Sequence, residues 1–200
     1  MSENILLPGQ ELILASSSPY RKALLQRLNV DFATHSPNID ETLKEGETAH
    51  DYVERLSVEK AQVLLSSYPE GVIIGSDQCA LLDGKILGKP GDFDHAHAQL
   101  TASSGQRVDF LTGLCVIDGK SGRIQSGVEH FSVQFRRLRS DEITRYLEQE
   151  EPYNCAGSFK SEGLGVTLFN SMRGDDPTAL IGLPLIKLCS YLRALDCALP

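Results

Sequence analysis

Apolar residues are spaced along this chain in two ways, as short continuous runs and as recurrences every three or four positions. Short runs bounded by turn residues are typical of buried strands, whereas the spacing of three or four is typical of amphipathic helices. The runs predict a hairpin over residues 80–87 and strands at residues 11–16, 31–36, 72–76, 106–118 and 123–138. The spacing predicts helices at residues 19–28, 48–66, 93–102, 140–149 and 184–195. Strands and helices are interspersed along the chain, which is the order of a mixed α/β fold.

Local residue types refine these elements. The run over residues 72–76 is continuously apolar up to Ser76, which indicates a strand covered on both faces. The hairpin is expected to turn at Asp83-Gly84, a dipeptide that favours tight turns between paired strands. Ser140 is expected to be the N-cap of the fourth helix. No repeat, low-complexity tract or linker divides the sequence, which leaves open one domain or two closely packed lobes.

Composition and charge narrow the functional class. The chain has 200 residues, 41% hydrophobic and 23% charged, which is enough apolar material for a sizeable core. Its formal net charge of −8 argues against a general nucleic-acid binder, because such proteins need basic surfaces to neutralise phosphates. The first residues contain no basic segment before a long apolar stretch, and no apolar run is long enough to span a membrane. We therefore expect a cytoplasmic protein with no membrane or nucleic-acid partner.

The cysteines are odd in number and none has Cys-x-x-Cys spacing. This pattern fits reduced thiols in the core better than a disulfide framework or a zinc site. We expect the same of Cys155, although it precedes a polar, glycine-rich stretch. The five residues are Cys79, Cys115, Cys155, Cys189 and Cys197.

The turn between the first strand and the first helix has the chemistry of an anion site. Ser18 suits the N-cap position and Pro19 the first helical position, so free backbone N–H groups and the helix dipole lie beside Arg21 and Lys22. Anions bind at such helix N-termini. The alternative is an ordinary capped helix with two solvated cations.

Two acidic segments offer carboxylates for catalysis. Asp77 follows the apolar run at 72–76, where a carboxylate is held rigidly and is suited to act as a general base or a metal-bound activator of water. The alternative is a capping aspartate. Asp40 and Glu41 add oxygen ligands of the kind that magnesium or manganese prefers. The alternative for that segment is a solvated acidic loop.

Three lysines and one arginine supply positive charge in distinct contexts. Lys60 lies on an expected helix, Lys89 in a Gly-Lys-Pro loop, and Lys160 in a Ser-Phe-Lys-Ser-Glu-Gly turn. Taken singly, each lysine is more often a solvated surface charge. Together with Arg21 they are enough to offset the charge of a triphosphate, which a single cation cannot do.

Several common catalytic motifs do not occur in the sequence. There is no P-loop, no Gly-x-Gly-x-x-Gly after a strand and no Gly-x-Ser-x-Gly elbow. P-loop NTPases, dinucleotide oxidoreductases and serine hydrolases of the α/β type lose support accordingly. A carboxylate near several cations instead indicates metal-assisted attack of water on a phosphate.

Six segments, in this order and at these separations, resemble those of the Maf family of nucleoside triphosphate pyrophosphatases over residues 12–195. They are Ala15–Lys22, Ile39–Glu41, Glu59–Ala61, Ile74–Gln78, Gly88–Pro90 and Gly157–Gly163. The segment from Cys155 onward is most similar to the branch of the family that hydrolyses 7-methyl-GTP. The resemblance implies a single-domain, ITPase-like fold with a central twisted mixed sheet, flanking helices and a deep nucleotide cleft. It also implies a homodimer and hydrolysis of a nucleoside triphosphate to the monophosphate and pyrophosphate, with a divalent cation such as Mg or Mn as cofactor.

The resemblance also implies roles for individual residues. Asp77 would be the proton acceptor, and Glu41 would hold the metal together with Asp77. The residues implied in binding phosphates are Ser16, Arg21, Lys60, Lys89 and Lys160. Lys22 stands where many relatives have arginine and lacks the planar guanidinium fork.

Base preference is implied at three positions, Tyr20, Gln78 and Glu162. The ring system of 7-methylguanine is positively charged, so the ring of Tyr20 would stack on it and the carboxylate of Glu162 would accept from its N–H edge. The alternative is that Tyr20 packs on its helix and Glu162 only orients Lys160.

Two other functions stay open at this point. One is a pyrophosphatase for pyrimidine or other unmodified nucleoside triphosphates, against which Tyr20 and Glu162 argue. The other is a nucleotide-binding regulator of cell division, a role with which the family name is associated. The presence of Asp77 with the set of lysines favours catalysis over regulation.

Overall fold

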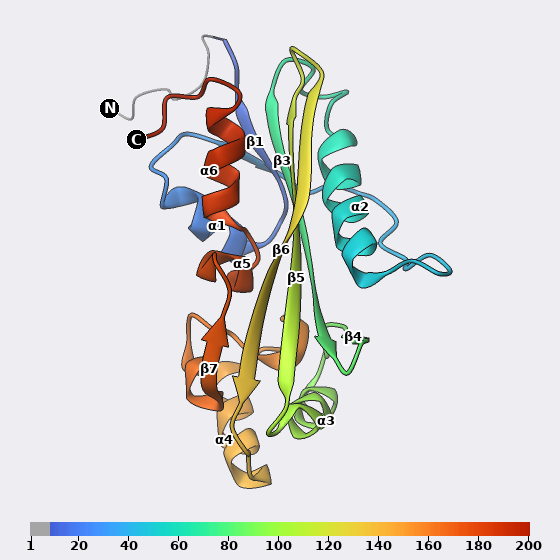
Figure 1. The fold of residues 1–200 in the computed structure, drawn as a ribbon, viewed down its shortest axis with the longest axis vertical. Helices are drawn as coiled ribbons and strands as arrows, with labels where there is room; N and C mark the ends of the chain where they lie inside the picture. The colour runs from blue at the N-terminus through green and yellow to red at the C-terminus, as the bar shows by residue number, and fades with distance from the viewer. Residues whose placement is uncertain (1–8) are drawn as a thin grey trace. The chain divides into compact units, whose positions relative to one another are not determined.

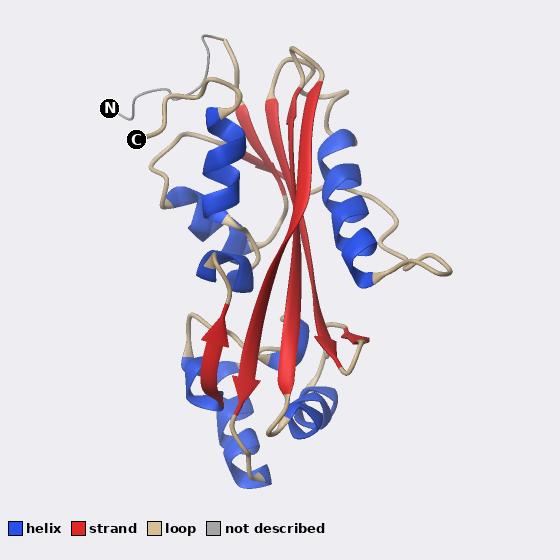
Figure 2. Ribbon diagram, in the orientation of Figure 1, coloured by secondary structure: helices blue, strands red, loops and turns tan. Residues whose placement is uncertain are grey.

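Seven strands form one mixed sheet in the computed structural model, which describes residues 9–200 (Figures 1 and 2). The strands lie in the order β2-β1-β3-β5-β6-β7, and β4 pairs with β3. Their bounds are β1 Leu12–Ala15, β2 Ala33–His35, β3 Val72–Leu82, β4 Lys85–Leu87, β5 Arg107–Asp118, β6 Arg123–Phe135 and β7 Phe169–Arg173. β1 runs parallel to β2 and β3, whereas β4 and β7 run antiparallel to their partners. The predicted α/β class with a mixed sheet is confirmed.

Five of the six described α-helices fall close to the predicted positions, and the helix over Pro177–Ile181 is additional. They are α1 Pro19–Gln26, α2 Ala49–Gln62, α3 Phe93–Ser103, α4 Ser140–Glu150, α5 Pro177–Ile181 and α6 Leu185–Arg193, with short 3₁₀ turns at Ala156–Ser158 and Leu164–Leu168. Ser18 and Thr48 cap α1 and α2, each accepting a backbone N–H of the first turn. No helix in residues 9–200 is both long enough and apolar enough to cross a membrane. The prediction about the first eight residues lies outside the described residues.

The described chain divides into two compact units, and each is built from separate stretches of sequence. Unit 1 comprises residues up to Asp77, Thr112–Glu129 and Gly182–Pro200, and unit 2 comprises Gln78–Leu111 and His130–Ile181. The chain passes from one unit to the other after residues 77, 111, 129 and 181. The single domain over residues 1–200 therefore stays a prediction.

In unit 1, α2 lies against one face of the strands, and α1 and α6 lie against the other (Figure 1). One core cluster beneath α2 is made of aliphatic side chains and a thiol. Its buried members are Ile13, Ala15, Ala61, Leu64, Ile73, Cys115 and Ile117. β1 is buried at all four positions, so it is covered on both faces as its apolar sequence indicates.

The core of unit 2 contains a cluster of aromatic rings. Phe159 packs edge-on against Phe110, Phe135 and Phe169, with ring centroids 4.8 to 5.7 Å apart. Edge-to-face packing of this kind adds to the burial of apolar area. The cluster anchors the turn after α4, because Phe159 immediately precedes Lys160.

The longest departure from the predicted elements is β3, which runs through Asp77 to Leu82 instead of ending at Ser76. The polar side chains in the middle of this strand find partners, so the strand has no reason to end there. Ser76 Oγ donates to the carbonyl oxygens of Gly113 and Gly182, at 2.8 and 3.0 Å. The prediction that Asp77 lies at a strand end is therefore wrong, since it lies in mid-strand.

Smaller departures concern the second half of the chain. β6 ends at Phe135, three residues before the predicted end, and β7 and α5 were not predicted. β7 is exposed at four of its five positions, so it lacks the apolar run that marks a strand. Ser140 is the first helical residue of α4 and not its N-cap, a position that Arg139 occupies.

All five cysteines are free thiols, as predicted. Cys79, Cys115 and Cys197 are buried, and burial raises the pKa of Cys115 to about 12. Cys155 and Cys189 are only half-buried, so the prediction of a buried core thiol is wrong for Cys155. The reason is local, because Cys155 lies in the turn region between α4 and Phe159.

Candidate active site

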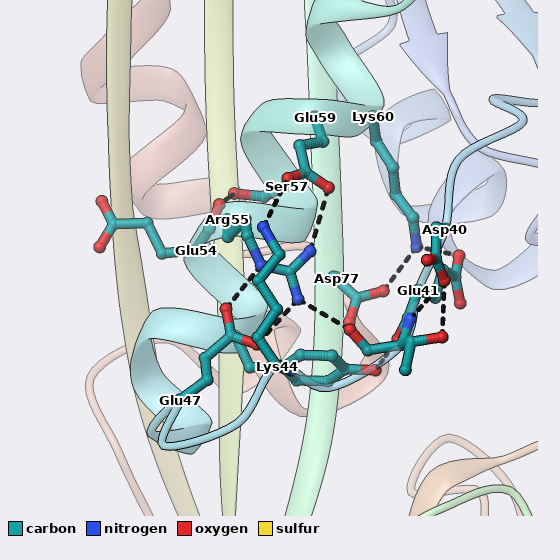
Figure 3. Close-up of polar contacts among 12 residues, drawn as sticks. Asp40, Glu41, Lys44, Glu47, Glu54, Arg55, Ser57, Glu59, Lys60 and Asp77 are labelled. Carbon is teal, nitrogen blue, oxygen red and sulfur yellow. Dashed lines mark hydrogen bonds and ion pairs between the residues drawn. The ribbon is translucent and has the colours of Figure 1, made fainter.

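One buried lysine links two carboxylates in unit 1. The ammonium of Lys60 lies 2.6 Å from Asp77 Oδ1 and 2.7 Å from Glu41 Oε1 (Figure 3). The side chains of Lys60 and Asp77 are 8% and 12% exposed, whereas that of Glu41 is 54% exposed. Three predicted site residues are thus brought together, from α2, β3 and the loop before α2. A buried carboxylate compensated by a cation is suited to accept a proton from a bound water.

Two glycines allow α2 to approach the sheet closely enough to place Lys60 there. A Cβ atom on Gly75 of β3 would lie 2.0 Å from the carbonyl oxygen of Ser57. A Cβ atom on Gly113 of β5 would lie 2.1 Å from the carbonyl oxygen of Val53. β3 and β5 are neighbours in the sheet, so the two glycines form a seat for the backbone of α2. Gly75 and Asp77 are two residues apart and share a face of β3, so Lys60 on α2 meets Asp77.

The loop that carries Glu41 is held by α2 through polar contacts. Arg55 Nε and Nη2 lie 2.5 and 2.8 Å from the two carboxylate oxygens of Glu47. The same guanidinium donates to the carbonyl oxygen of Thr42 at 3.1 Å. Tyr52 donates its hydroxyl proton to the carbonyl oxygen of Glu41 at 2.9 Å. Neither Arg55 nor Glu47 is a residue that the sequence analysis singled out.

The predicted anion site at the start of α1 also lies in unit 1. Ser16 is buried and its hydroxyl accepts the backbone N–H of Ser18 at 3.1 Å. Arg21 Nε donates to the carbonyl oxygen of Gly182 at 2.8 Å. Burial lowers the pKa of the Arg21 guanidinium, while the charges of Asp77 and Glu41 act in the opposite direction. The charge of Arg21 is therefore stabilised by both Asp77 and Glu41.

Tyr20 and Lys22 also lie near this turn. Tyr20 is half-buried on α1, and Lys22 is exposed. The predicted role of Tyr20 in base preference stays a prediction, as does that of Lys22.

The other predicted site residues belong to unit 2. Lys89 is exposed, and its ammonium forms no ion pair with a carboxylate in residues 9–200. Gln78 Nε2 donates to the carbonyl oxygens of Ala179 and Leu180, at 2.7 and 3.2 Å, and so ties β3 to α5. The amide nitrogen of Gln78 thus has a structural role, and its predicted part in base preference stays a prediction.

Lys160 is held by the end of α4. Its ammonium donates to the carbonyl oxygen of Glu150 at 2.5 Å and lies 3.5 Å from Glu150 Oε1. Its backbone N–H donates to the hydroxyl of Tyr146 at 3.1 Å. Glu162 is exposed and accepts from the hydroxyl of Ser161. The carboxylate that contacts the ammonium of Lys160 is therefore that of Glu150. Within residues 9–200 no contact joins Glu162 to that ammonium, so the structure does not support the alternative role of Glu162 in orienting Lys160.

Glu150 is a functional candidate that the sequence analysis missed. Its Oε2 accepts the backbone N–H of Leu164 at 2.6 Å, and a Cβ atom on Gly163 would lie 2.6 Å from the same oxygen. One carboxylate thus holds both ends of the turn that carries Lys160 and Glu162. The signal in the sequence was a second acidic residue beside Glu151 just before Pro152, but acidic pairs at helix ends are common on surfaces.

The donor set fits a divalent metal ion shared with a substrate. The residues from 9 to 200 contain no group of three or more His, Cys, Asp or Glu side chains arranged to hold a metal. Magnesium is nevertheless often held by one or two carboxylates together with waters and substrate phosphates. Glu41 and Asp77 supply two such carboxylates, with the Lys60 ammonium between them. The metal site stays a prediction.

Comparisons with known proteins find one matching family and relatives that share one name. The model of the family described as Maf-like protein matches residues 11–195. The chain is 57% identical over 181 residues to the 7-methyl-GTP pyrophosphatase of Pseudomonas syringae pv. tomato, covering 90% of this chain and 94% of that protein. It is 53% identical over 182 residues to the 7-methyl-GTP pyrophosphatase of Pseudomonas aeruginosa, covering 91% of this chain and 95% of that protein.

A solved structure supports the fold independently of close sequence similarity. The Staphylococcus aureus Ham1 protein superposes with a TM-score of 0.54 at 12% identity, covering 92% of this chain and 99% of that one. At this identity the likeness concerns the fold alone. It confirms the predicted ITPase-like arrangement, while the deep nucleotide cleft stays a prediction.

Proposed function

The chain belongs to the Maf family, and from this premise we propose that it hydrolyses a modified nucleoside triphosphate, preferentially 7-methyl-GTP, to the monophosphate and pyrophosphate. The observation that carries the proposal is the 57% identity, over nearly the full length of both chains, to a protein named 7-methyl-GTP pyrophosphatase. A relative from Alcanivorax borkumensis, 52% identical over 94% of the chain, has the same name. The chain is accordingly a hydrolase that acts on an acid anhydride.

Asp77 is the proton acceptor in the proposed reaction. Water attacks the α-phosphorus, one of its protons passes to Asp77, the α–β bridging P–O bond breaks, and pyrophosphate leaves. The 2.6 Å contact with Lys60 supports this role, because the ammonium fixes the orientation of the carboxylate. A base held in position typically contributes a factor of ~10²–10⁴ to such a reaction.

The cations divide the charge of the triphosphate among them. Arg21 offers a guanidinium whose pKa is lowered by burial, an effect that the charges of Asp77 and Glu41 oppose. Ser16 lies just before the N-terminus of α1, where backbone N–H groups favour anions. Lys60 contributes its ammonium from α2. By resemblance to the family, Lys89 and Lys160 bind the remaining phosphate oxygens, and the exposed position of Lys89 suits that role.

We propose that Glu41 and Asp77 also hold the divalent metal ion. When bound, the ion neutralises charge on the phosphates and polarises their P–O bonds. The half-exposed carboxylate of Glu41 supports this assignment, because a metal bound together with substrate needs an oxygen donor that solvent and substrate reach.

The preference for a methylated base rests on Tyr20 and Glu162. A 7-methylguanine ring is cationic, so it gains from an aromatic face and a nearby carboxylate where guanine gains less. The exposed position of Glu162 leaves its carboxylate accessible to a substrate. Gln78 is the third position assigned to base preference, on the resemblance to the family.

Three broader features complete the proposal. We propose a homodimer in the cytoplasm that acts on free nucleotides and does not bind nucleic acid. The net charge of −8 supports the last point, since it disfavours binding to extended polyanions. Light scattering of the purified protein tests the dimer, and a mass equal to one chain would contradict it.

A nucleotide panel tests the proposed activity. Purified protein with Mg²⁺ or Mn²⁺ is offered 7-methyl-GTP, GTP, CTP and UTP, and products are identified by mass spectrometry. We expect monophosphate and pyrophosphate, with the highest kcat/KM for 7-methyl-GTP. In H₂¹⁸O the label should enter the monophosphate, because water attacks the α-phosphorus. Release of orthophosphate, or label in pyrophosphate, would overturn the proposed chemistry.

A further inference from the structure

The loop that carries Glu41, residues 40–47, lies largely in solvent. Apart from the half-buried Glu47, every residue of the loop is exposed, and even Leu43 is 46% exposed. Apolar packing therefore does not determine where this loop lies. Its position depends on polar contacts, and the contacts that tie it to a rigid element converge on α2 (Figure 3).

Arg55 makes the largest number of these contacts. Its guanidinium forms a fork with both carboxylate oxygens of Glu47 and also donates to the carbonyl oxygen of Thr42. Its remaining nitrogen, Nη1, donates to Glu59 at 3.0 Å, which fixes the guanidinium against its own helix. The arginine side chain is 16% exposed, and its bonds to Glu47 and Glu59 are partly buried, whereas its bond to Thr42 is exposed.

Tyr52 connects the same arrangement to Glu41. The Arg55 guanidinium lies over the Tyr52 ring, 5.7 Å from its centroid. The hydroxyl of that ring donates to the backbone carbonyl of Glu41, whose carboxylate contacts Lys60. The path from Arg55 to the carboxylate of Glu41 thus consists of contacts within one compact unit.

We propose that Arg55 is a positioning residue, which holds loop 40–47 on α2 so that the Glu41 carboxylate meets Lys60. This inference rests on the proposed function, because Glu41 matters to activity only if the site hydrolyses nucleotides. Lysine cannot replace arginine in this role, since an ammonium is a point charge and cannot form a fork with Glu47 while also reaching Thr42.

The first experiment measures the position of the loop without any substrate. Lys44 is exposed in the loop, so the rate of tryptic cleavage after Lys44 reports how often the loop leaves α2. We expect Arg55→Lys to raise that rate roughly tenfold, as release of a single well-held contact does. The matched control is Arg139→Lys. Arg139 forms a similar fork with Asp141 at the start of α4, and cleavage after Lys44 should not change.

The second experiment asks whether Arg55 acts through Glu41. We expect Arg55→Lys to lower kcat/KM roughly tenfold in the wild-type background. In a Glu41→Gln background the same change should lower it less than about twofold, because the contact it serves is already lost. A merely structural arginine would give equal factors in the two backgrounds, and that result would overturn the proposal.

Tyr52→Phe keeps the experiment informative if Arg55→Lys folds poorly. It removes only the hydroxyl that reaches Glu41, and it should lower kcat/KM several-fold in the wild type but not in the Glu41→Gln background. Unchanged cleavage after Lys44 in Arg55→Lys would also overturn the proposal. A chain without pyrophosphatase activity on any nucleotide would refute the proposed function, while the cleavage experiment would still test the role of Arg55 in holding the loop.

Discussion

At the scale of single residues, the feature that organises unit 1 is an ammonium shared by two carboxylates. Lys60 contacts Asp77 in the core and Glu41 at the surface, at 2.6 and 2.7 Å. A buried lysine is stable only when its charge is compensated, so each of the three residues constrains the other two. The pairing explains why a polar residue is tolerated in the middle of a buried strand.

Asp77→Asn should abolish hydrolysis while leaving the fold largely intact. The amide has the shape of the carboxylate but cannot accept a proton, and the loss of a general base typically costs ~10²–10⁴-fold in rate. Single-turnover rates at saturating metal and substrate measure the effect, and far-ultraviolet circular dichroism serves as the control for folding. Turnover close to that of the wild type would show that the base lies elsewhere, with Glu41 the next candidate.

Tyr20→Ala and Glu162→Gln should reduce the preference for 7-methyl-GTP over GTP more than they reduce the rate on GTP. A cation–π contact shielded from water is worth ~2 kcal/mol, which is more than tenfold in discrimination. Competition assays with both nucleotides measure the ratio of kcat/KM values. Tyr20→Phe is the matched control, because it keeps the aromatic face and should keep the preference. Equal kcat/KM for the two nucleotides in the wild type would refute the specificity but not the pyrophosphatase activity.

At the scale of elements, the seat formed by Gly75 and Gly113 determines how closely α2 approaches the sheet. The backbone of α2 occupies the space that two side chains would otherwise fill. The same helix carries Lys60 on its buried face, so packing at the seat and geometry at Asp77 are set by one helix position.

Gly75→Ala should therefore harm both stability and activity. The added methyl group would lie 2.0 Å from the Ser57 carbonyl oxygen, so α2 must move. Overpacking of this kind costs typically ~1–3 kcal/mol in the free energy of unfolding. Urea unfolding measures that loss, and Gly88→Ala is the control, because a Cβ atom there has no neighbour within 4 Å. An unfolding midpoint equal to that of the wild type would show that the seat is not tightly packed.

The sequence predicted most elements, and the longest departure, the extension of β3, has a clear physical cause. Apolar periodicity located β1, α1, α2 and the β3–β4 hairpin, since those patterns depend on neighbouring residues. The extension of β3 depends on Ser76 finding partners at Gly113 and Gly182, which are far away in sequence. Long-range polar contacts leave no periodic trace.

Long-range polar contacts also explain which residues of the site the sequence did not predict. Family resemblance identified Asp77, Lys60 and Glu41, and the structure brings the three together. Arg55 and Glu150 were missed because each acts through contacts with a segment distant in sequence. Arg55 holds loop 40–47, and Glu150 holds the turn that carries Lys160. Neither has a distinctive neighbour in the sequence.

At the scale of the whole molecule, carboxyl groups in both units are stabilised in their charged form. Each accepts a hydrogen bond that lowers its pKa, from a hydroxyl, a backbone N–H or an arginine. They include Asp40, Glu47, Asp92, Asp141 and Glu142. A group whose pKa is lower in the folded state contributes stability above its unfolded pKa and loses that contribution as the pH falls through the folded value.

Acid should therefore destabilise the protein through these groups. Arg55 lowers the pKa of Glu47 from 4.5 to about 2, so the contribution of Glu47 should disappear between those two values. We expect the urea midpoint of the wild type to fall as the pH is lowered through this window, and Glu47→Gln to make that fall shallower. The control is Glu148→Gln at an exposed position of α4. Equal slopes in the two variants would contradict the role assigned to Glu47.

The helix α2 holds loop 40–47 through Arg55 and places Lys60 at Asp77. Both tasks depend on the number of residues between Arg55 and Lys60. Tyr52 and Arg55 contact the backbone of the loop, whereas Lys60 is buried and contacts Asp77 of β3 as well as the carboxylate of Glu41. Each inserted or deleted residue rotates everything beyond it by about 100° and shifts it by about 1.5 Å. One inserted residue between Arg55 and Lys60 would preserve every side chain and still separate the two tasks. In the evolutionary history of such chains, this stretch of α2 should accept substitutions far more readily than insertions or deletions.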